Sequence, residues 1–185
     1  MNSKKLSYIK KTASLKNTLL LALLFLIMSL FIMPEATKQI KQYSHETGLI
    51  DKLLYYPPSK VYAMLSAYGE RGRNLYLVVE LTADMVFSIV IAAFLGFLLI
   101  WSSLKSRNFS IKMKYLLWLP VALLLANWLE NGGIIWMLIN FPEQYFFLAL
   151  VTSFFTLSKW ILILICGGIA GWNLVKLSTS LTSRT

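Results

Sequence analysis

Residues 115–139 decide the fold and read YLLWLPVALLLANWLENGGIIWMLI. They are long enough and apolar enough to cross about 30 Å of hydrocarbon as a helix. Within them, Asn127, Glu130 and Asn131 fall at spacings of three and four residues, which places them on one helical face. A carboxylate inside a membrane helix costs a few kcal/mol on insertion scales, so such residues usually face the interior of a bundle. The stretch therefore predicts a membrane bundle with a polar site around Glu130.

The whole chain has the composition of a membrane protein. Of its 185 residues, 57% are hydrophobic and only 14% are charged, which is far more apolar than a soluble domain of this length. We predict an all-α fold, a single integral membrane domain over residues 1–185 that forms a four-transmembrane-helix bundle. The predicted helices are residues 18–33, 75–101, 115–139 and 146–173, with an external loop over 34–74 and tails over 1–17 and 174–185.

The first predicted helix is the shortest, and it has two interpretations. A basic leader followed by an apolar stretch is typical of a secretory signal as well as of a membrane anchor. The nearest candidate cleavage site, Pro34-Glu35-Ala36, lacks the small residue that is required three positions before the cut. We therefore favour an uncleaved anchor. Ser29 is the only clear polar residue inside this sequence segment, so we expect a scaffold helix without chemistry.

The basic residues form blocks that predict the orientation of the chain. The net charge of +10 would favour nucleic-acid binding in a soluble protein. Here both tails and the connection 102–114 are basic and carry no acidic residue, whereas the turn 140–145 has no Lys or Arg. The loop 34–74 is also basic, but it contains acidic residues as well. The positive-inside rule then places both termini in the cytoplasm, and we expect no nucleic-acid partner. The blocks contain Lys4, Lys5, Lys10, Lys11, Lys16, Lys105, Arg107, Lys112, Lys114, Lys176 and Arg184.

The sequence offers no set of ligands for zinc or haem. Cys166 is the only cysteine and lies in the apolar body of the last predicted helix, where it is a core residue more readily than a nucleophile. His45 is the only histidine and lies in a polar loop. A zinc or haem site needs more such ligands than the chain contains. We therefore predict no metal and no cofactor.

The external loop contains a short predicted helix. Ser59 follows two prolines and is suited to cap a helix, and Gly69 is suited to end it. Four apolar residues between them share one face, at spacings of three, four and seven. The resulting amphipathic helix would be either an interfacial anchor or a cap over the mouth of the bundle, and both interpretations remain open. Its apolar residues are Val61, Met64, Leu65 and Tyr68.

A polar stripe enters the second predicted helix from its outer end. Its members follow one another at three- and four-residue steps, which a helix exposed to lipid on all sides would not tolerate. We interpret the first three as an outer rim, in which Arg73 and Glu80 form a structural ion pair. Asp84 lies deeper and is the stronger candidate for a functional role. The stripe consists of Arg73, Tyr76, Glu80, Asp84 and Ser88.

The last predicted helix carries Thr152, Thr156 and Lys159 on one face. Because side chains lean toward the N-terminus of their helix, the Lys159 ammonium and the Glu130 carboxylate would approach a common depth. We therefore predict a buried Glu130–Lys159 ion pair. Farther along, small residues are spaced for close helix approach and not for phosphate binding. These small residues are Gly167, Gly168 and Gly171.

These polar positions resemble the pattern of an uncharacterised family of small bacterial four-helix integral membrane proteins. In that family Asp is common where Asn127 stands and Pro where Ser88 stands, so we expect one acidic position to be weakened in this chain. The resemblance covers residues from about 50 to 160 and supports the architecture only, with no activity. We expect the protein to lie in a bacterial cytoplasmic (inner) membrane. It rests on Gly69, Gly72, Arg73, Tyr76, Asp84, the Asn127-x-x-Glu130-Asn131 run, Pro142 and Thr156-x-x-Lys159.

Three classes of function fit these residues. The first is a protein that binds, or helps to transport, a small molecule or a lipid in an intramembrane polar pocket. The second is a structural scaffold or partner subunit with a satisfied polar core. The third is an intramembrane enzyme acting on a lipid or isoprenoid, with Glu130 as acid or base. Membrane lipids are expected partners, and the sequence leaves the oligomeric state open. The expected pocket or network comprises Asp84, Asn127, Glu130, Asn131, Thr156 and Lys159.

Overall fold

The computed structural model of the chain describes residues 11–44, 48–106 and 116–182. The predictions for several residues named above fall outside these ranges. These residues are the basic leader up to Lys10, His45, the basic residues Arg107, Lys112 and Lys114, and Arg184.

The first helical stretch continues beyond the end that the sequence predicts. Its start is capped by the Ser14 hydroxyl, which accepts a hydrogen bond from the Asn17 backbone N–H at 3.3 Å. It runs on through Pro34, because a wider π-helical turn directly before this residue relieves the clash of the proline ring with the preceding turn. The stretch comprises α2 (Leu15–Ile27), the π turn η1 (Met28–Ile32) and α3 (Met33–Tyr43).

The remaining elements include three more long helical stretches. The second stretch also contains a π turn, and this turn holds both Glu80 and Asp84. It comprises α5 (Gly69–Val79), η3 (Glu80–Asp84) and α6 (Met85–Lys105), and it is followed by α8 (Trp118–Ile139) and α9 (Phe146–Thr182). Between the first and second stretches lie a short 3-10 turn, η2 (Ile50–Lys52), and the helix α4 (Pro58–Ala67).

The helix α4 confirms that the loop contains a helix. The four residues predicted to share its apolar face, Val61, Met64, Leu65 and Tyr68, are all buried. Gly69 ends it with a φ of 61°, a left-handed conformation that glycine adopts without strain. The prediction that Ser59 caps its start is wrong. The helix begins one residue earlier, at Pro58, whose missing N–H needs no cap.

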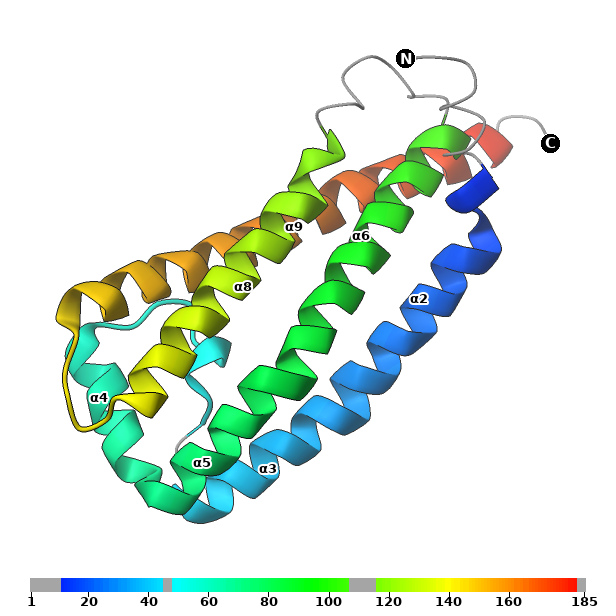
Figure 1. Cartoon of the computed structure of the whole chain (residues 1–185). Coiled ribbons are helices and arrows are strands. Elements are labelled where there is room, and N and C mark those ends of the chain that lie inside the picture. Colours follow the sequence, from blue (N-terminus) through cyan, green and yellow to red (C-terminus); the bar gives the residue numbers. More distant parts are fainter. Residues whose placement is uncertain (1–10, 45–47, 107–115, 183–185) are drawn as a thin grey trace.

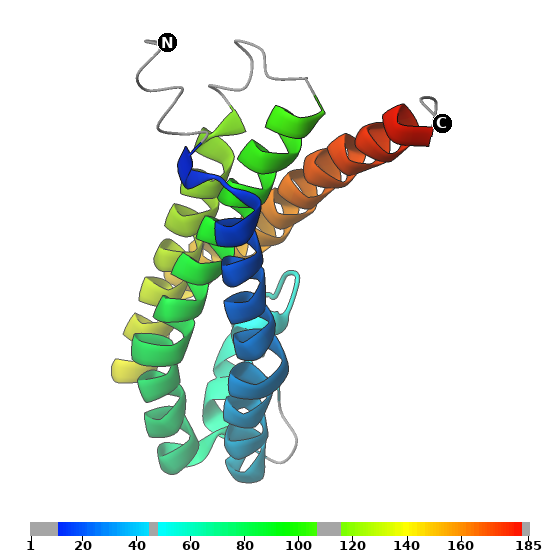
Figure 2. The same cartoon turned by 90° about the vertical axis from the view of Figure 1, so that its right-hand side faces the viewer.

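Four helical stretches are long and apolar enough to cross a membrane. Figure 1 shows α2–α3, α5–α6 and α8 side by side, while α9 crosses them obliquely. In Figure 2, the C-terminal part of α9 lies progressively farther from α2. The helix α4 lies at the end of the bundle opposite the C-terminal ends of α6 and α9. Over the described residues the protein is thus all-helical, with four candidate membrane spans.

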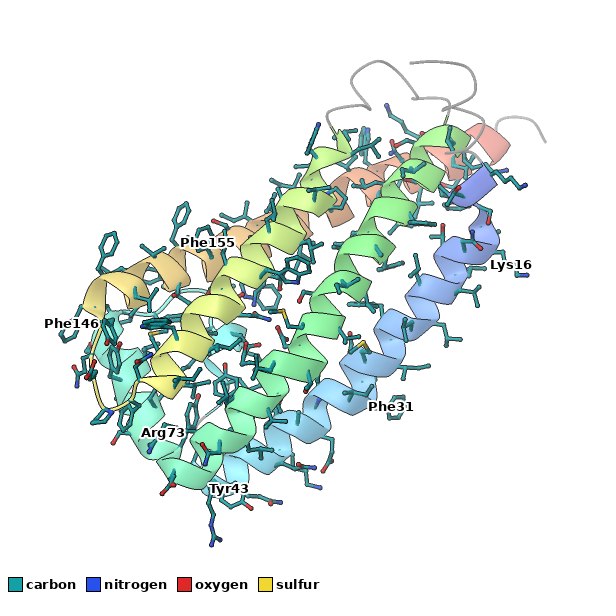
Figure 3. The ribbon with its side chains drawn as sticks, in the orientation of Figure 1. Lys16, Phe31, Tyr43, Arg73, Phe146 and Phe155 are labelled. Atoms are coloured by element: carbon teal, nitrogen blue, oxygen red, sulfur yellow. The ribbon has the colours of Figure 1, made fainter. Side chains whose placement is uncertain are left out.

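The outer surface of the bundle is apolar. Phe31 and Phe146 point away from the helices in Figure 3 and are 69% and 53% exposed. Leu164 on α9 is 72% exposed. Contiguous exposed apolar surface of this kind suits contact with acyl chains and not with water.

The helices α8 and α9 approach closely at Gly133. A Cβ atom at Gly133 would lie 2.0 Å from the Thr152 hydroxyl oxygen, so only glycine permits this contact. The expectation that the Gly167, Gly168 and Gly171 cluster mediates close packing is not met. A Cβ atom at any of these three glycines meets no atom within 4 Å, because α9 has diverged from its neighbours there.

Candidate functional site

The predicted ion pair between α8 and α9 is present. The Lys159 ammonium lies 2.6 Å from Glu130 Oε2, and the two side chains are 9% and 0% exposed. The approach at Gly133 brings the backbones of α8 and α9 close enough for these two side chains to meet. Glu130 Oε1 has no hydrogen-bond partner among the described residues. Because each charge is buried, the loss of either would leave the other without its counter-ion.

Residues 48–57, which we call the inner segment, enter the bundle and complete this site. The Lys159 ammonium also donates a hydrogen bond to the backbone carbonyl of Asp51 at 3.0 Å. The indole N–H of Trp160 donates to the carbonyl of Leu53 at 3.2 Å. Non-helical backbone is tolerated among membrane helices only where protein or a water-filled cavity surrounds it. Side chains of α9 therefore supply the hydrogen bonds that lipid could not.

Tyrosine hydroxyls fix both ends of the inner segment. Tyr68 donates to the carbonyl of Gly48 at 2.7 Å, and Tyr76 donates to Asp51 Oδ1 at 2.8 Å. At the other end, the Tyr56 hydroxyl lies 3.2 Å from that of Thr156. The Tyr56 ring is fully buried, and this burial raises the pKa of its hydroxyl well above the ordinary value. Tyr56 therefore stays neutral and serves as a hydrogen-bonding group.

The π turn η3 contributes a second buried carboxylate. Asp84 is 5% exposed, and its Oδ2 atom accepts a hydrogen bond from the side-chain amide of Asn131 at 2.7 Å. The geometry brings together two residues that the sequence places in one polar network. Asn127 behaves differently, because its amide donates back to the Leu123 carbonyl of its own helix at 2.9 Å.

The predicted Arg73–Glu80 ion pair is wrong. Arg73 donates to the Leu65 carbonyl at 3.0 Å and lies 4.2 Å above the ring of Phe141. Glu80 is 1% exposed, and among the described residues no donor reaches either of its carboxylate oxygens. The half-buried arginine turns back toward the carbonyl end of α4, where a free backbone acceptor is available.

A cavity of ≈ 480 Å³ adjoins these residues. Its polar wall includes Asp84, Asn127 and Lys159, and its apolar wall includes aromatic rings from three helices. Both π turns contribute to it, through Ser29 and Asp84, so the first helix, which the sequence predicts to be a scaffold, also lines the cavity. The Ser29 hydroxyl oxygen is buried and has no hydrogen-bond partner among the described residues. The full lining is Phe25, Ser29, Met33, Asp51, Lys52, Asp84, Phe87, Ile91, Asn127, Lys159, Trp160 and Ile163.

The cavity reaches the molecular surface between α2 and α9. Phe25, Trp160 and Ile163 line it while being only partly buried. Figure 2 shows that these two helices diverge on this side of the bundle. Glu130 and Asn131 lie behind Lys159 and Asp84 and do not line the cavity. The charges that a molecule in the cavity would meet are therefore those of Lys159, Asp84 and the inner segment.

The arrangement can bind polar and apolar groups together. Within the described residues, no group of three or more His, Cys, Asp or Glu side chains is placed to hold a metal ion. A fully buried Glu130 that does not line the cavity gives no support to a direct acid–base role. What remains is a pocket lined by both charged and aromatic or aliphatic side chains, which are the usual components of a ligand site.

Sequence reasoning missed the inner segment. Asp51, Tyr56 and Trp160 all take part in the site, yet none was predicted there. One signal was available, because residues 49–56 are mostly apolar and aromatic although they lie in a predicted external loop. An exposed loop is ordinarily polar. Such an apolar run around a lone acid therefore indicates a connection that is packed against the helices.

Comparison of the chain with models of protein families, with curated proteins and with solved structures finds no match. The function of the protein is therefore inferred from the geometry of the site.

Proposed function

We propose that this protein binds a small amphipathic molecule or a lipid in the cavity between α2 and α9. The observation that carries the proposal is the composition of the cavity wall. Buried charged residues form one part of it, and Phe25, Phe87 and Ile163 form another. The volume of ≈ 480 Å³ falls within the range of about 300 to 1,000 Å³ that is usual for ligand pockets.

The two π turns support a functional role for the cavity. π turns inside helices are rare and are frequently found at functional sites. Here η1 carries Ser29 and η3 carries Asp84, and both residues line the same cavity. Unpartnered polar atoms in such a wall offer hydrogen bonds that only a bound molecule or water would use.

The first experiment fills the cavity. Ile163→Trp places a large ring in the cavity wall, whereas Leu164→Trp adds the same ring at the next residue, which is 72% exposed. Native mass spectrometry of the purified protein should show a co-purified lipid or small molecule in the wild type and in Leu164→Trp. It should show much less in Ile163→Trp. Equal occupancy in all three proteins would overturn the proposal.

The orientation belongs to the same proposal. We place both termini in the cytoplasm of a bacterial cell, with α4 and the inner segment on the outer side of the inner membrane. The blocks of Lys and Arg support this, as does the position of α4 at the opposite end of the bundle from the C-terminal ends of α6 and α9. In a Cys166→Ala background, a membrane-impermeant thiol reagent should label Ser59→Cys from outside. It should label Ser106→Cys only after permeabilisation, and the reverse pattern would invert the model.

A further inference from the structure

We infer that the molecule bound in this cavity is an amphipathic cation, with an amine or quaternary ammonium group held by Asp84. This inference rests on the proposed function and narrows it to a class of ligand. It combines the balance of buried charge, the contacts of Lys159 and the aromatic wall of the cavity.

The buried charges of the site do not balance. Four carboxyl groups are buried among the described residues, but only one basic side chain is buried with them. That base is already paired with one of the four, because Lys159 lies 2.6 Å from Glu130. A buried carboxyl group without a counter-ion is driven toward its neutral form, so a cation beside it would favour the carboxylate and would be bound as its counter-ion. The four acids are Asp51, Glu80, Asp84 and Glu130.

Asp84 is the acid best placed to meet a ligand. It lines the cavity, and among the described residues its carboxylate accepts a side-chain hydrogen bond only from the neutral amide of Asn131. Within the described residues, no Lys or Arg lies within ion-pair distance of it. Asp51 also lines the cavity, but its Oδ1 atom already accepts a hydrogen bond from Tyr76. Glu80 does not line the cavity.

The two lysines of the cavity wall are poorly placed to select an anion. The Lys159 charge is neutralised by Glu130, and a second contact goes to the Asp51 carbonyl at 3.0 Å. Lys52 is exposed, and its ammonium donates to the Thr37 hydroxyl at 2.6 Å. An anionic ligand would therefore enter near an uncompensated carboxylate without a free cation to offset it.

Aromatic rings add a second attraction for a cation. Phe25 and Phe87 line the cavity and are stacked with ring centroids 5.8 Å apart. The Trp160 ring also lines the cavity, but the Lys159 ammonium already lies over it, 5.8 Å from its centroid. The face of an aromatic ring attracts an ammonium group, and this attraction strengthens when the cation is desolvated. The same rings also receive an alkyl chain. The wall thus suits a molecule that combines a cationic head with an apolar tail.

The test uses three probes with the same alkyl chain: decylamine, decanol and decanoate. Native mass spectrometry of the full chain, released from detergent micelles, gives an apparent Kd for each probe. Partition into the micelle is the same for every protein variant, so the ratio of Kd between variants reports on the site alone. In the wild type, decylamine should bind more tightly than decanol, and decanoate should bind most weakly.

The variants separate the carboxylate from general effects. Asp84→Asn should weaken decylamine binding by about tenfold or more, because a charge-assisted contact is lost, and should weaken decanol binding far less. Asp84→Glu keeps the carboxylate and should keep the preference for the amine. Glu143→Gln removes an exposed acid near α9 and is the control for net charge. If Asp84→Asn does not fold, the order of the three probes in the wild type still decides the matter.

Two failures can be told apart. A wild type that prefers decanoate or decanol, or an Asp84→Asn variant that binds decylamine as the wild type does, would overturn the inference and leave the proposed cavity intact. If the Ile163→Trp variant binds all three probes as tightly as the wild type, the cavity is not the binding site, and the proposed function fails with the inference.

Discussion

The two sides of α9 differ in how they meet the rest of the bundle. Toward α8, the backbones approach so closely that Gly133 has no space for a side chain, and a buried ion pair joins the helices. Toward α2, α9 diverges, and a cavity of ≈ 480 Å³ remains. One helix thus forms a tight interface and one wall of an open site.

A charged group that is paired with an opposite charge holds helices together, whereas a charged group without such a partner is available to a ligand. On the α8 side, Glu130 and Lys159 satisfy one another, as expected for residues that hold two helices together. On the cavity side, Asp84 has an amide partner only, and the Ser29 hydroxyl has none among the described residues. Substitutions on the first side should therefore alter stability, and substitutions on the second should alter binding.

The largest effect is expected at the ion pair. Glu130→Gln leaves the Lys159 ammonium buried without its counter-ion and should lower the free energy of unfolding by about 3 to 5 kcal/mol. The double variant Glu130→Gln/Lys159→Met should recover much of this loss. Thermal unfolding in detergent, analysed as a double-mutant cycle, measures the coupling. Additive losses would mean that the two residues stabilise the bundle independently.

The next effect distinguishes two neighbouring glycines on α8. Gly133→Ala forces a Cβ atom against Thr152 and should lower the free energy of unfolding by about 1 to 3 kcal/mol. A Cβ atom at Gly132 meets nothing within 4 Å, so Gly132→Ala should raise stability by up to about 1 kcal/mol through helix propensity. Opposite signs in chemical denaturation would confirm that the α8 side is tightly packed. Equal losses would contradict it.

A smaller effect is expected in the inner segment. Tyr56→Phe removes the hydroxyl that contacts Thr156 and should lower stability by about 0.5 to 1.5 kcal/mol. Tyr55 is 56% exposed, so Tyr55→Phe is the matched control and should have little effect. Because burial raises the pKa of Tyr56, its contribution is full below pH 10 and falls as the pH rises toward that raised value. Between pH 10 and higher pH, the free energy of unfolding should therefore fall less in Tyr56→Phe than in the wild type.

The smallest effect is expected on the cavity side. Ser29→Ala deletes a buried hydroxyl that has no partner among the described residues, so the free energy of unfolding should stay within about 0.5 kcal/mol of the wild type. Ser88 is the control, because its hydroxyl donates to the Asp84 carbonyl at 2.6 Å. Ser88→Ala should cost more than Ser29→Ala in the same thermal scan. The reverse order would show that Ser29 has a structural partner.

The helices and the ion pair followed from the sequence because both depend on local periodicity. Apolar runs of sufficient length predict spans, and steps of three and four residues placed Glu130 opposite Lys159. The features that the sequence did not predict depend on contacts between residues that are far apart in the chain. No periodicity predicts that Arg73 turns toward Leu65 and leaves Glu80 unpaired. Likewise, whether the glycines of α9 are packed depends on the angle at which α9 crosses its neighbours, which side-chain packing sets.

The inner segment has a consequence for how the protein is made. Its hydrogen bonds to Ser153, Thr156, Lys159 and Trp160 join residues about one hundred positions apart in the chain. During synthesis, the inner segment leaves the ribosome well before α9 does. Its backbone groups at Asp51, Leu53 and Tyr56 must therefore remain hydrated, or be held by a chaperone or the insertion machinery, until the last span arrives. Packing of α9 against the bundle is then the step that withdraws this segment from water.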